Sequence, residues 1–153
     1  MGDLELHLPP NIAYVSLARL VVCAAARLAG MDDERVEDLR IAVSEATTNA
    51  VAAHLRASQP QPVTIEFGDA GGGTFEVTIA DAGPGFQPSP PQALAERGWD
   101  VEGGLGVTII RNLADEVRFD RDGGMRVSMR FTLDGWAGLQ VAAAADTGEV
   151  PVP

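Results

Sequence analysis

Two pairs of segments in this 153-residue chain alternate apolar and polar side chains with a period of two, and a glycine-rich turn joins each pair. The first pair covers residues 63–67 and 75–79, on either side of glycines 71–73, and the second covers 117–119 and 127–133. This pattern is typical of antiparallel hairpins in which one side of each strand is buried. The chain must therefore build a sheet with one face that needs a cover.

Three helices are expected to supply that cover. The first should extend over residues 12–28, with Asn11 as its N-cap and Gly30 near its C-terminal cap. The second should run from about residue 33 to Arg56, and a third over 105–113. The apolar stripe expected on the first helix includes Ile12, Val15, Leu20, Val22 and Cys23.

The order of these elements predicts the fold class and the domain limits. A further alternating segment, residues 4–8, adds a strand, and the result is an α+β fold: a two-layer sandwich with a mixed, mostly antiparallel sheet covered by helices on one face. Residues 81–103 form a long loop rich in glycine and proline, with a short helical possibility near 93–97. We expect one domain over residues 1–133 and a disordered tail over 134–153.

The charge composition excludes several classes of function. All 11 basic side chains are arginines, so a Walker-A loop and Schiff-base chemistry, which need lysine, are excluded. A formal net charge of −11 argues against direct binding to nucleic acid or to an anionic membrane. With one cysteine and two histidines the chain cannot build a zinc finger, and no apolar stretch is long enough to span a membrane. We therefore expect a cytoplasmic protein.

Three motifs could carry chemistry. Glu45 and Asn49 lie one helical turn apart and should share a helix face, although such a pair is also common on a solvated surface. Asp81 ends a strand and precedes two glycines, so its carboxylate could accept a hydrogen bond from an exocyclic amine, or it could simply begin a turn. Residues 102–106 place three glycines before a helix, where backbone amides could bind phosphate or form a hinge.

The order and spacing of the three motifs resemble the N, G1 and G2 boxes of the GHKL (Bergerat-fold) ATP-binding superfamily. The resemblance covers roughly residues 4–133. Within the superfamily, the run Val43–Val51 is similar to that of the bacterial anti-sigma-factor serine/threonine protein kinases. The segments 16–20 and 113–117 resemble the same branch.

The resemblance implies a role for each matching residue. Asn49 would coordinate Mg²⁺ on the nucleotide phosphates, and Glu45 would be the general base toward a serine hydroxyl. Asp81 would bind the adenine amine, and Arg19 on the first helix would contact protein partners. The ATP-binding residues implied by the resemblance are Asn49, Asp81, Gly83, Gly85, Gly104, Leu105 and Gly106.

The resemblance also implies partners. It predicts that the protein sequesters a sigma factor, phosphorylates an anti-sigma antagonist of the STAS type, and forms a homodimer. The chain departs from the family pattern at two places: Ala53 stands where a histidine is common, with His54 one position later, and Met125 stands where a threonine commonly follows the paired glycines.

Other functional classes fit the sequence less well. A module that binds nucleotide and acts only by occluding its partner is the alternative, and the presence of Glu45 favours the kinase over it. A histidine kinase needs a phosphoacceptor helix pair, for which we find no spare segment. An ATPase of the Hsp90 or gyrase kind needs further domains for coupled motion.

Overall fold

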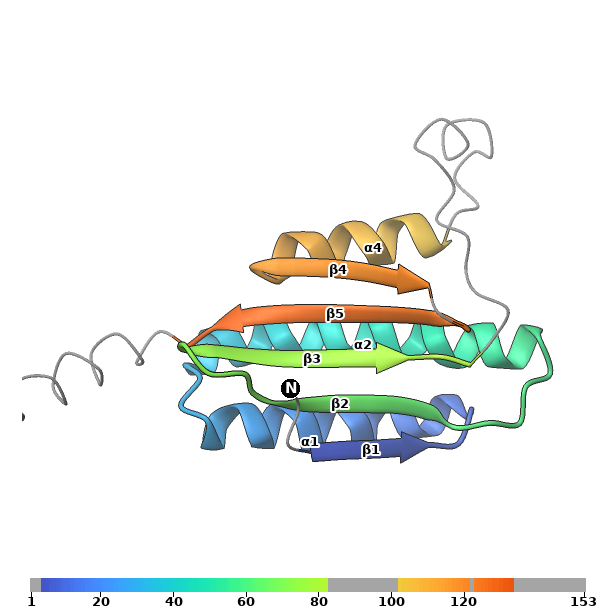
Figure 1. Ribbon diagram of the computed structural model, residues 1–153, viewed down its shortest axis with the longest axis horizontal. Coiled ribbons are helices and arrows are strands. Elements are labelled where there is room, and N and C mark those ends of the chain that lie inside the picture. The colour runs from blue at the N-terminus through green and yellow to red at the C-terminus, as the bar shows by residue number, and fades with distance from the viewer. Residues whose placement is uncertain (1–3, 83–101, 122, 134–153) are drawn as a thin grey trace, which may run out of the picture.

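A five-stranded sheet with the order β1-β2-β3-β5-β4 forms one layer of the molecule (Figure 1). The structure is a computed structural model that describes residues 4–82, 102–121 and 123–133. All four strand pairings are antiparallel, and both expected hairpins are present, as β2–β3 and β4–β5. The strands are β1 (Leu4–Leu8), β2 (Val63–Asp69), β3 (Thr74–Ala80), β4 (Glu116–Arg121) and β5 (Met125–Thr132).

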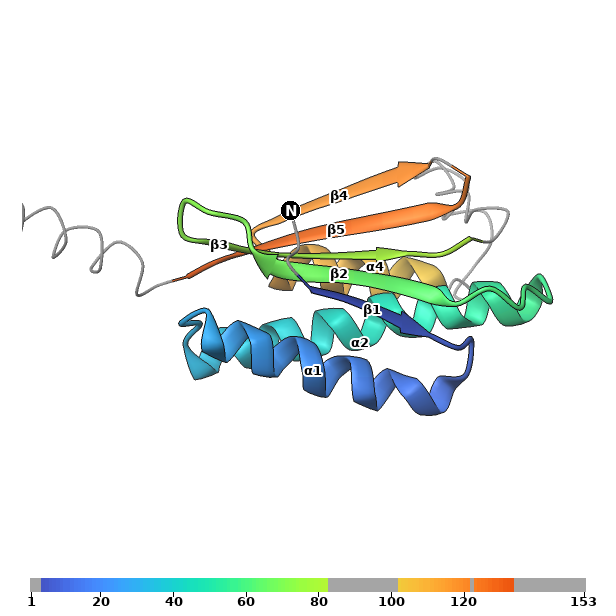
Figure 2. The ribbon, with the colours of Figure 1, turned by 60° about the horizontal axis from the view of Figure 1, so that its bottom comes forward.

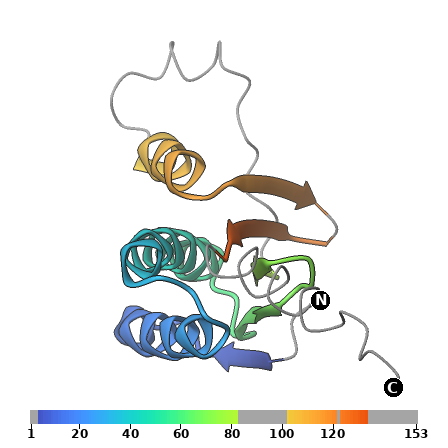
Figure 3. The ribbon, with the colours of Figure 1, turned by 90° about the vertical axis from the view of Figure 1, so that its left-hand side faces the viewer.

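The helices form the second layer, on one face of the sheet (Figures 2 and 3). They are α1 (Val15–Leu28), α2 (Asp33–Arg56) and α4 (Glu102–Leu113), and a short 3₁₀ helix, η1 (Ile12–Tyr14), precedes α1. Helix α2 lies between α1 and α4. This arrangement confirms the predicted two-layer α+β sandwich, but the described sheet is wholly antiparallel rather than mixed. No helix among the described residues is both long and apolar enough to cross a membrane.

The apolar positions of the strands meet between the two layers. In the pairing of β3 with β5, Phe75 lies opposite Phe131 and Val77 opposite Met129, and all four side chains are buried. At the β2–β3 turn, three successive glycines have φ values of 80°, 64° and 74° at residues 71–73. Residues with side chains rarely adopt this backbone conformation, which explains why the hairpin carries a run of glycine.

The predicted stripe of α1 is partly wrong. Val15, Val22 and Cys23 are buried as expected, but Leu20 is 67% exposed and Ile12 is 57% exposed. The buried stripe is completed by Ala18 and Ala26, which follow the spacing of one helix face. The largest apolar side chains were a misleading signal here, because small alanines pack this helix against its neighbours.

Helix α4 begins at Glu102, three residues earlier than the sequence indicated. Glycine weakens isolated helices by about 1 kcal/mol per residue relative to alanine, so residues 103 and 104 favoured a loop in the prediction. Packing of α4 on α2 overrides that local preference. The rest of the expected loop, with its possible short helix near 93–97, and the expected disordered tail over 134–153 lie outside the described residues.

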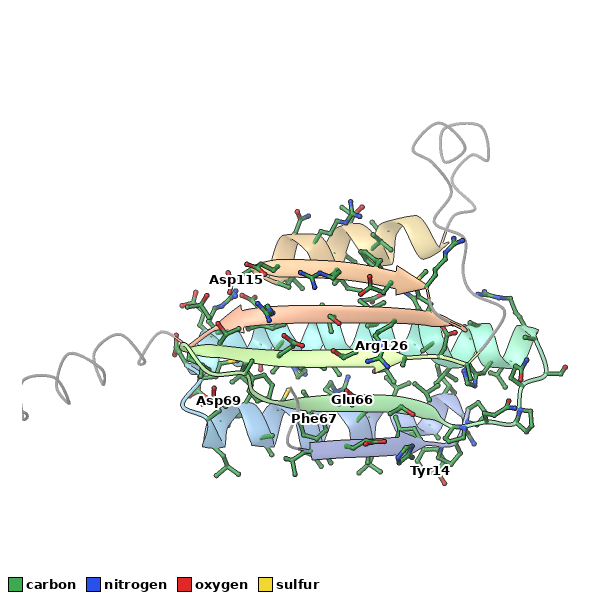
Figure 4. All side chains as sticks on the ribbon, viewed as in Figure 1. Tyr14, Glu66, Phe67, Asp69, Asp115 and Arg126 are labelled. Carbon is green, nitrogen blue, oxygen red and sulfur yellow. The ribbon has the colours of Figure 1, made fainter. Side chains whose placement is uncertain are left out.

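An ion-pair network fixes the other end of α4. Arg35 of α2 donates to the Leu113 carbonyl at 3.1 Å and to the Asp115 carboxylate at 2.7 Å. Its guanidinium also lies over the Phe131 ring, 5.3 Å from the ring centre. Asp115, labelled beside the end of α4 in Figure 4, accepts a further hydrogen bond from the Thr132 N–H. One arginine thus joins α2, α4 and β5.

This network predicts a dependence of stability on pH. Burial alone would raise the pKa of Asp115, but the Thr132 N–H and the Arg35 guanidinium outweigh it and lower the pKa. A depressed carboxyl pKa stabilises the fold above the usual carboxyl range, and this contribution is lost as pH falls through the folded-state pKa. We expect Asp115→Asn to lower the free energy of unfolding at neutral pH by less than about 1 kcal/mol, because the side chain is partly exposed. Urea titrations should show the difference shrinking as the pH falls below the usual carboxyl range, and a difference independent of pH would contradict the ion-pair account. Asp120→Asn, which removes an exposed carboxylate of β4, is the control.

A second prediction concerns a buried hydroxyl in α2. Thr47 is 0% exposed, and its Oγ1 has no hydrogen-bond partner among the described residues. Thr47→Val keeps the shape and removes the unsatisfied group, so it should stabilise the protein by about 1 kcal/mol in urea unfolding. Thr78→Val is the matched control, because the buried Thr78 hydroxyl is 3.0 Å from Ser128 Oγ. The Thr78→Val variant should not gain stability in urea unfolding. Equal effects of the two substitutions would contradict the prediction.

Candidate functional site

Helix α2 presents two of the predicted residues, Glu45 and Asn49, side by side. They lie one turn apart on the helix, and both side chains are half-buried. The neighbouring positions Ala46 and Ala50 are buried in the core. Glu45 and Asn49 therefore lie at the border of the buried face, where polar groups can remain accessible while the helix around them is held rigid.

Helix α4 meets α2 at these two side chains. A Cβ atom placed on Gly106 would lie 3.2 Å from Glu45 Oε2, 3.2 Å from Asn49 Nδ2 and 3.8 Å from Asn49 Oδ1. The two side chains thus converge on the position where any other residue would carry its side chain. Gly106 itself is buried. The structure brings together the second-helix motif and the glycine motif, which are far apart in sequence.

The start of α4 supplies backbone donors near the same place. The N–H groups of the first three residues of an α-helix lack partners within the helix, and in α4 these belong to residues 102–104, which include Gly104. They carry the positive end of the helix dipole. The Leu105 side chain is 68% exposed. The amides of Leu105 and Gly106 come after these donors and are bonded within the helix, so the contribution of Gly106 is the absence of a side chain.

Asp81 lies at the end of β3, which is the end of the sheet nearest the start of α4 (Figure 1). Its N–H donates to the Met125 carbonyl at 2.9 Å, and its Oδ1 accepts from the Met125 N–H at 3.2 Å. The carboxylate is half-buried and held in a fixed place by the backbone of β5. The predicted Gly83 and Gly85 lie outside the described residues.

Two residues at this point were not predicted from the sequence. Gly124 packs so closely on Asp81 that a Cβ atom there would overlap the Asp81 carbonyl oxygen and lie 3.3 Å from Ala82 Cα. His54, fully buried at the end of α2, accepts a hydrogen bond from the Ala82 N–H at 2.9 Å. The helical spacing of Ala50 to His54 was the available signal for burial of the histidine, but no local pattern could show which segment it contacts.

Arg19 lies apart from the other predicted residues. It is on α1, and α2 separates α1 from α4 (Figure 3). Its Nη2 is 3.5 Å from Ser16 Oγ, and exposed Leu17 and Leu20 flank it. Arg19 thus belongs to the outer surface of the helical layer, on the far side of α2 from α4.

The donor set suits one kind of metal ion. The described residues contain no cluster of three or more histidine, cysteine, aspartate or glutamate side chains of the kind that a resident metal centre needs. Mg²⁺ is different, because it keeps several waters and is commonly held by one or two protein oxygens together with substrate phosphates. The Asn49 amide, located at the α2–α4 contact, can provide such an oxygen.

Comparison with known proteins identifies the family. Residues 8–131 match the family described as the histidine kinase-like ATPase domain. The chain is 35% identical over 135 residues to the serine-protein kinase RsbW of Bacillus licheniformis, with 82% of each chain covered. It is 34% identical to RsbW of Bacillus subtilis, with 86% of each chain covered. For RsbW of Listeria innocua the identity is 37%, over 82% of this chain and 84% of the relative.

A solved structure has the same fold. The crystal structure of the RsbU and RsbW domains of a Mycobacterium tuberculosis protein superposes with a TM-score of 0.64 at 18% identity, covering 84% of this chain and 32% of that one. The sequence matches confirm the resemblance to the anti-sigma-factor serine/threonine protein kinases, and membership of an ATPase family confirms ATP as the expected nucleotide. The chain belongs to the histidine kinase-like ATPase family and, within it, to the RsbW-type serine-protein kinases.

Proposed function

We propose that this kinase binds MgATP between α2 and the start of α4, sequesters a sigma factor, and phosphorylates a serine of a STAS-type anti-sigma antagonist. The observation that carries the proposal is the convergence of Glu45 and Asn49 on Gly106. A base and a metal ligand meet there beside the amides of a helix N-terminus. Phosphoryl transfer needs little more than positioning and neutralisation of charge, which these groups can supply without lysine.

Each nucleotide contact has a residue to make it. Asp81, whose carboxylate is held by the Met125 N–H, would accept a hydrogen bond from the adenine amine. The amides of residues 102–104 would bind phosphate oxygens, and Leu105 keeps its predicted place in the ATP-binding set. Asn49 would hold Mg²⁺, which when bound neutralises phosphate charge. Gly83 and Gly85 keep their predicted role of letting the backbone approach the adenine ring, and Gly104 and Gly106 that of wrapping the phosphates.

The Glu45 carboxylate would act as the general base. It accepts the proton of the antagonist's serine hydroxyl as the serine oxygen forms a bond to the γ-phosphorus. The bond from that phosphorus to the β–γ bridging oxygen breaks, and the products are phosphoserine and ADP. The proton leaves Glu45 for solvent afterwards. A positioned base of this kind contributes typically about 10²–10⁴-fold to the rate.

The outer surface of α1 suits the protein partners. Arg19 lies among exposed apolar side chains, and arginine beside apolar surface is typical of protein–protein contacts. The net charge of −11 would favour a sigma factor, whose DNA-binding surface is basic. We propose that Arg19 contacts such a partner, that the protein acts in the cytoplasm where these partners are found, and that it forms a homodimer. The acidic chain itself is not expected to bind nucleic acid or a membrane.

The kinase assignment makes a prediction about Glu45. Glu45→Gln keeps the size and hydrogen-bonding capacity of the side chain but removes the base. Phosphorylation of a purified STAS-type antagonist with Mg²⁺ and radiolabelled ATP should fall by at least about 10²-fold, whereas ATP affinity measured by calorimetry should change less than about threefold.

The same assay separates the kinase from a module that only occludes its partner. Undiminished transfer by Glu45→Gln would contradict the role of Glu45. Tight ATP binding by the wild type without phosphate on any antagonist tested would favour the occluding module. Glu34→Gln, an exposed substitution in the first turn of α2, is the control and should leave transfer unchanged.

A further inference from the structure

His54 is a buried polar side chain with both ring nitrogens engaged. The ring is 0% exposed, its Nδ1 lies 2.9 Å from the Gln61 carbonyl oxygen, and its Nε2 lies 2.9 Å from the Ala82 nitrogen. A carbonyl can only accept, so Nδ1 must carry the proton. The Ala82 N–H can only donate, so Nε2 must offer its lone pair. Both bonds exist together only in the neutral imidazole with its proton on Nδ1.

These two bonds connect the end of α2 to the segment that carries Asp81. Ala82 follows Asp81 directly, and its N–H donates to His54 Nε2. On the opposite side, Met125 and the side-chain-free Gly124 hold the Asp81 backbone. The segment is thus fixed between β5 and α2, and the His54 bond attaches it to the helical layer.

The position of His54 in the helix makes this contact possible. Successive residues of an α-helix point about 100° apart, so moving a histidine by one place changes the segment that it faces. Ala53, at the position where a histidine is common in the family, is half-buried, whereas His54 is completely buried and directed at Ala82. The departure from the family pattern therefore places an imidazole in contact with the strand end.

We propose that His54 is a positioning residue: through Ala82 it fixes the Asp81 carboxylate relative to Asn49 and thereby sets the preference for a nucleotide with an exocyclic amine. The inference rests on the proposed binding of adenine by Asp81. Because His54 and Asn49 are on the same helix, α2 holds the adenine-recognition and phosphate-recognition groups at a fixed separation. A carboxylate held in place accepts from the amine of ATP and repels the carbonyl oxygen that replaces it in ITP.

Two substitutions at position 54 each keep one hydrogen bond of the histidine and remove the other. His54→Asn can place an amide near the Nδ1 position, where it can still donate to the Gln61 carbonyl, but it is too short to reach Ala82. His54→Gln can place an oxygen near the Nε2 position, where it can accept from the Ala82 N–H. Calorimetry with MgATP and MgITP gives the ratio of the two affinities. This ratio is unaffected by a change that only lowers the folded fraction, since both nucleotides then lose equally.

We expect His54→Asn to lower the ATP-over-ITP ratio about three- to tenfold, corresponding to the loss of one hydrogen bond, and His54→Gln to retain most of it. Ala82→Pro removes the same N–H donor at an exposed position and leaves the buried histidine intact, so it should lower the ratio as His54→Asn does. If the histidine substitutions prevent folding, Ala82→Pro alone tests the proposal. A ratio unchanged in His54→Asn and Ala82→Pro, or lowered equally by Asn and Gln at position 54, would overturn the proposal.

Two further measurements distinguish failure of this inference from failure of the proposed function. The wild type should prefer ATP, and Asp81→Asn should abolish that preference. A wild type that binds nucleotide without preference would overturn the role of Asp81 and, with it, that of His54. The other outcome is a wild type that prefers ATP through Asp81 and a His54→Asn variant with the same ATP-over-ITP ratio. That result would overturn the role of His54 alone.

Discussion

The packing of α4 on α2 at Gly106 is the contact on which the candidate site depends. A Cβ atom at residue 106 would lie 3.2 Å from both Glu45 Oε2 and Asn49 Nδ2, so glycine at this position lets α4 approach without displacing either side chain. The approach brings the amides at the start of α4 to the helix that carries the proposed base and metal ligand. At the other end of α4, the hydrogen bonds of Arg35 to Leu113 and Asp115 fix the helix in place. The two attachments together fix the position of the proposed phosphate site.

The adenine end of the proposed site depends on a different kind of contact. Asp81 is fixed by backbone hydrogen bonds to Met125 and by close packing of Gly124, and these are features of the sheet rather than of the helices. His54 is the link from this segment to α2. A single rigid helix therefore connects both halves of the proposed site. This explains how a chain without lysine could bind a nucleotide through backbone amides, one amide side chain and one carboxylate.

The sequence predicted the hairpins, the helices and the order of the motifs because these depend on local periodicity and turn chemistry. Glycines 71–73, for instance, indicated the β2–β3 turn directly, and the structure gives them positive φ. The sequence failed where contacts between distant segments decide the outcome. Helix α4 starts early at Glu102 because it packs on α2, Leu20 is exposed because alanines form the buried stripe of α1, and the partners of His54 and Gly124 come from another part of the chain. The proposed roles of Glu45, Asn49 and Asp81 came from the family resemblance, and the structure supplies their positions.

The most direct test of this arrangement is the affinity of Gly106→Ala for MgATP, measured by calorimetry beside the wild type. Residue 106 is inside a helix, where alanine is more favourable than glycine by about 1 kcal/mol, so the substitution should not unfold α4 by itself. The added methyl group would lie 3.2 Å from both Glu45 Oε2 and Asn49 Nδ2 and force them or α4 to move. We expect at least about a tenfold loss of affinity, or about 1.4 kcal/mol, with thermal unfolding little changed. Wild-type affinity in this variant would contradict the claim that the nucleotide site is built at the contact of α2 with α4.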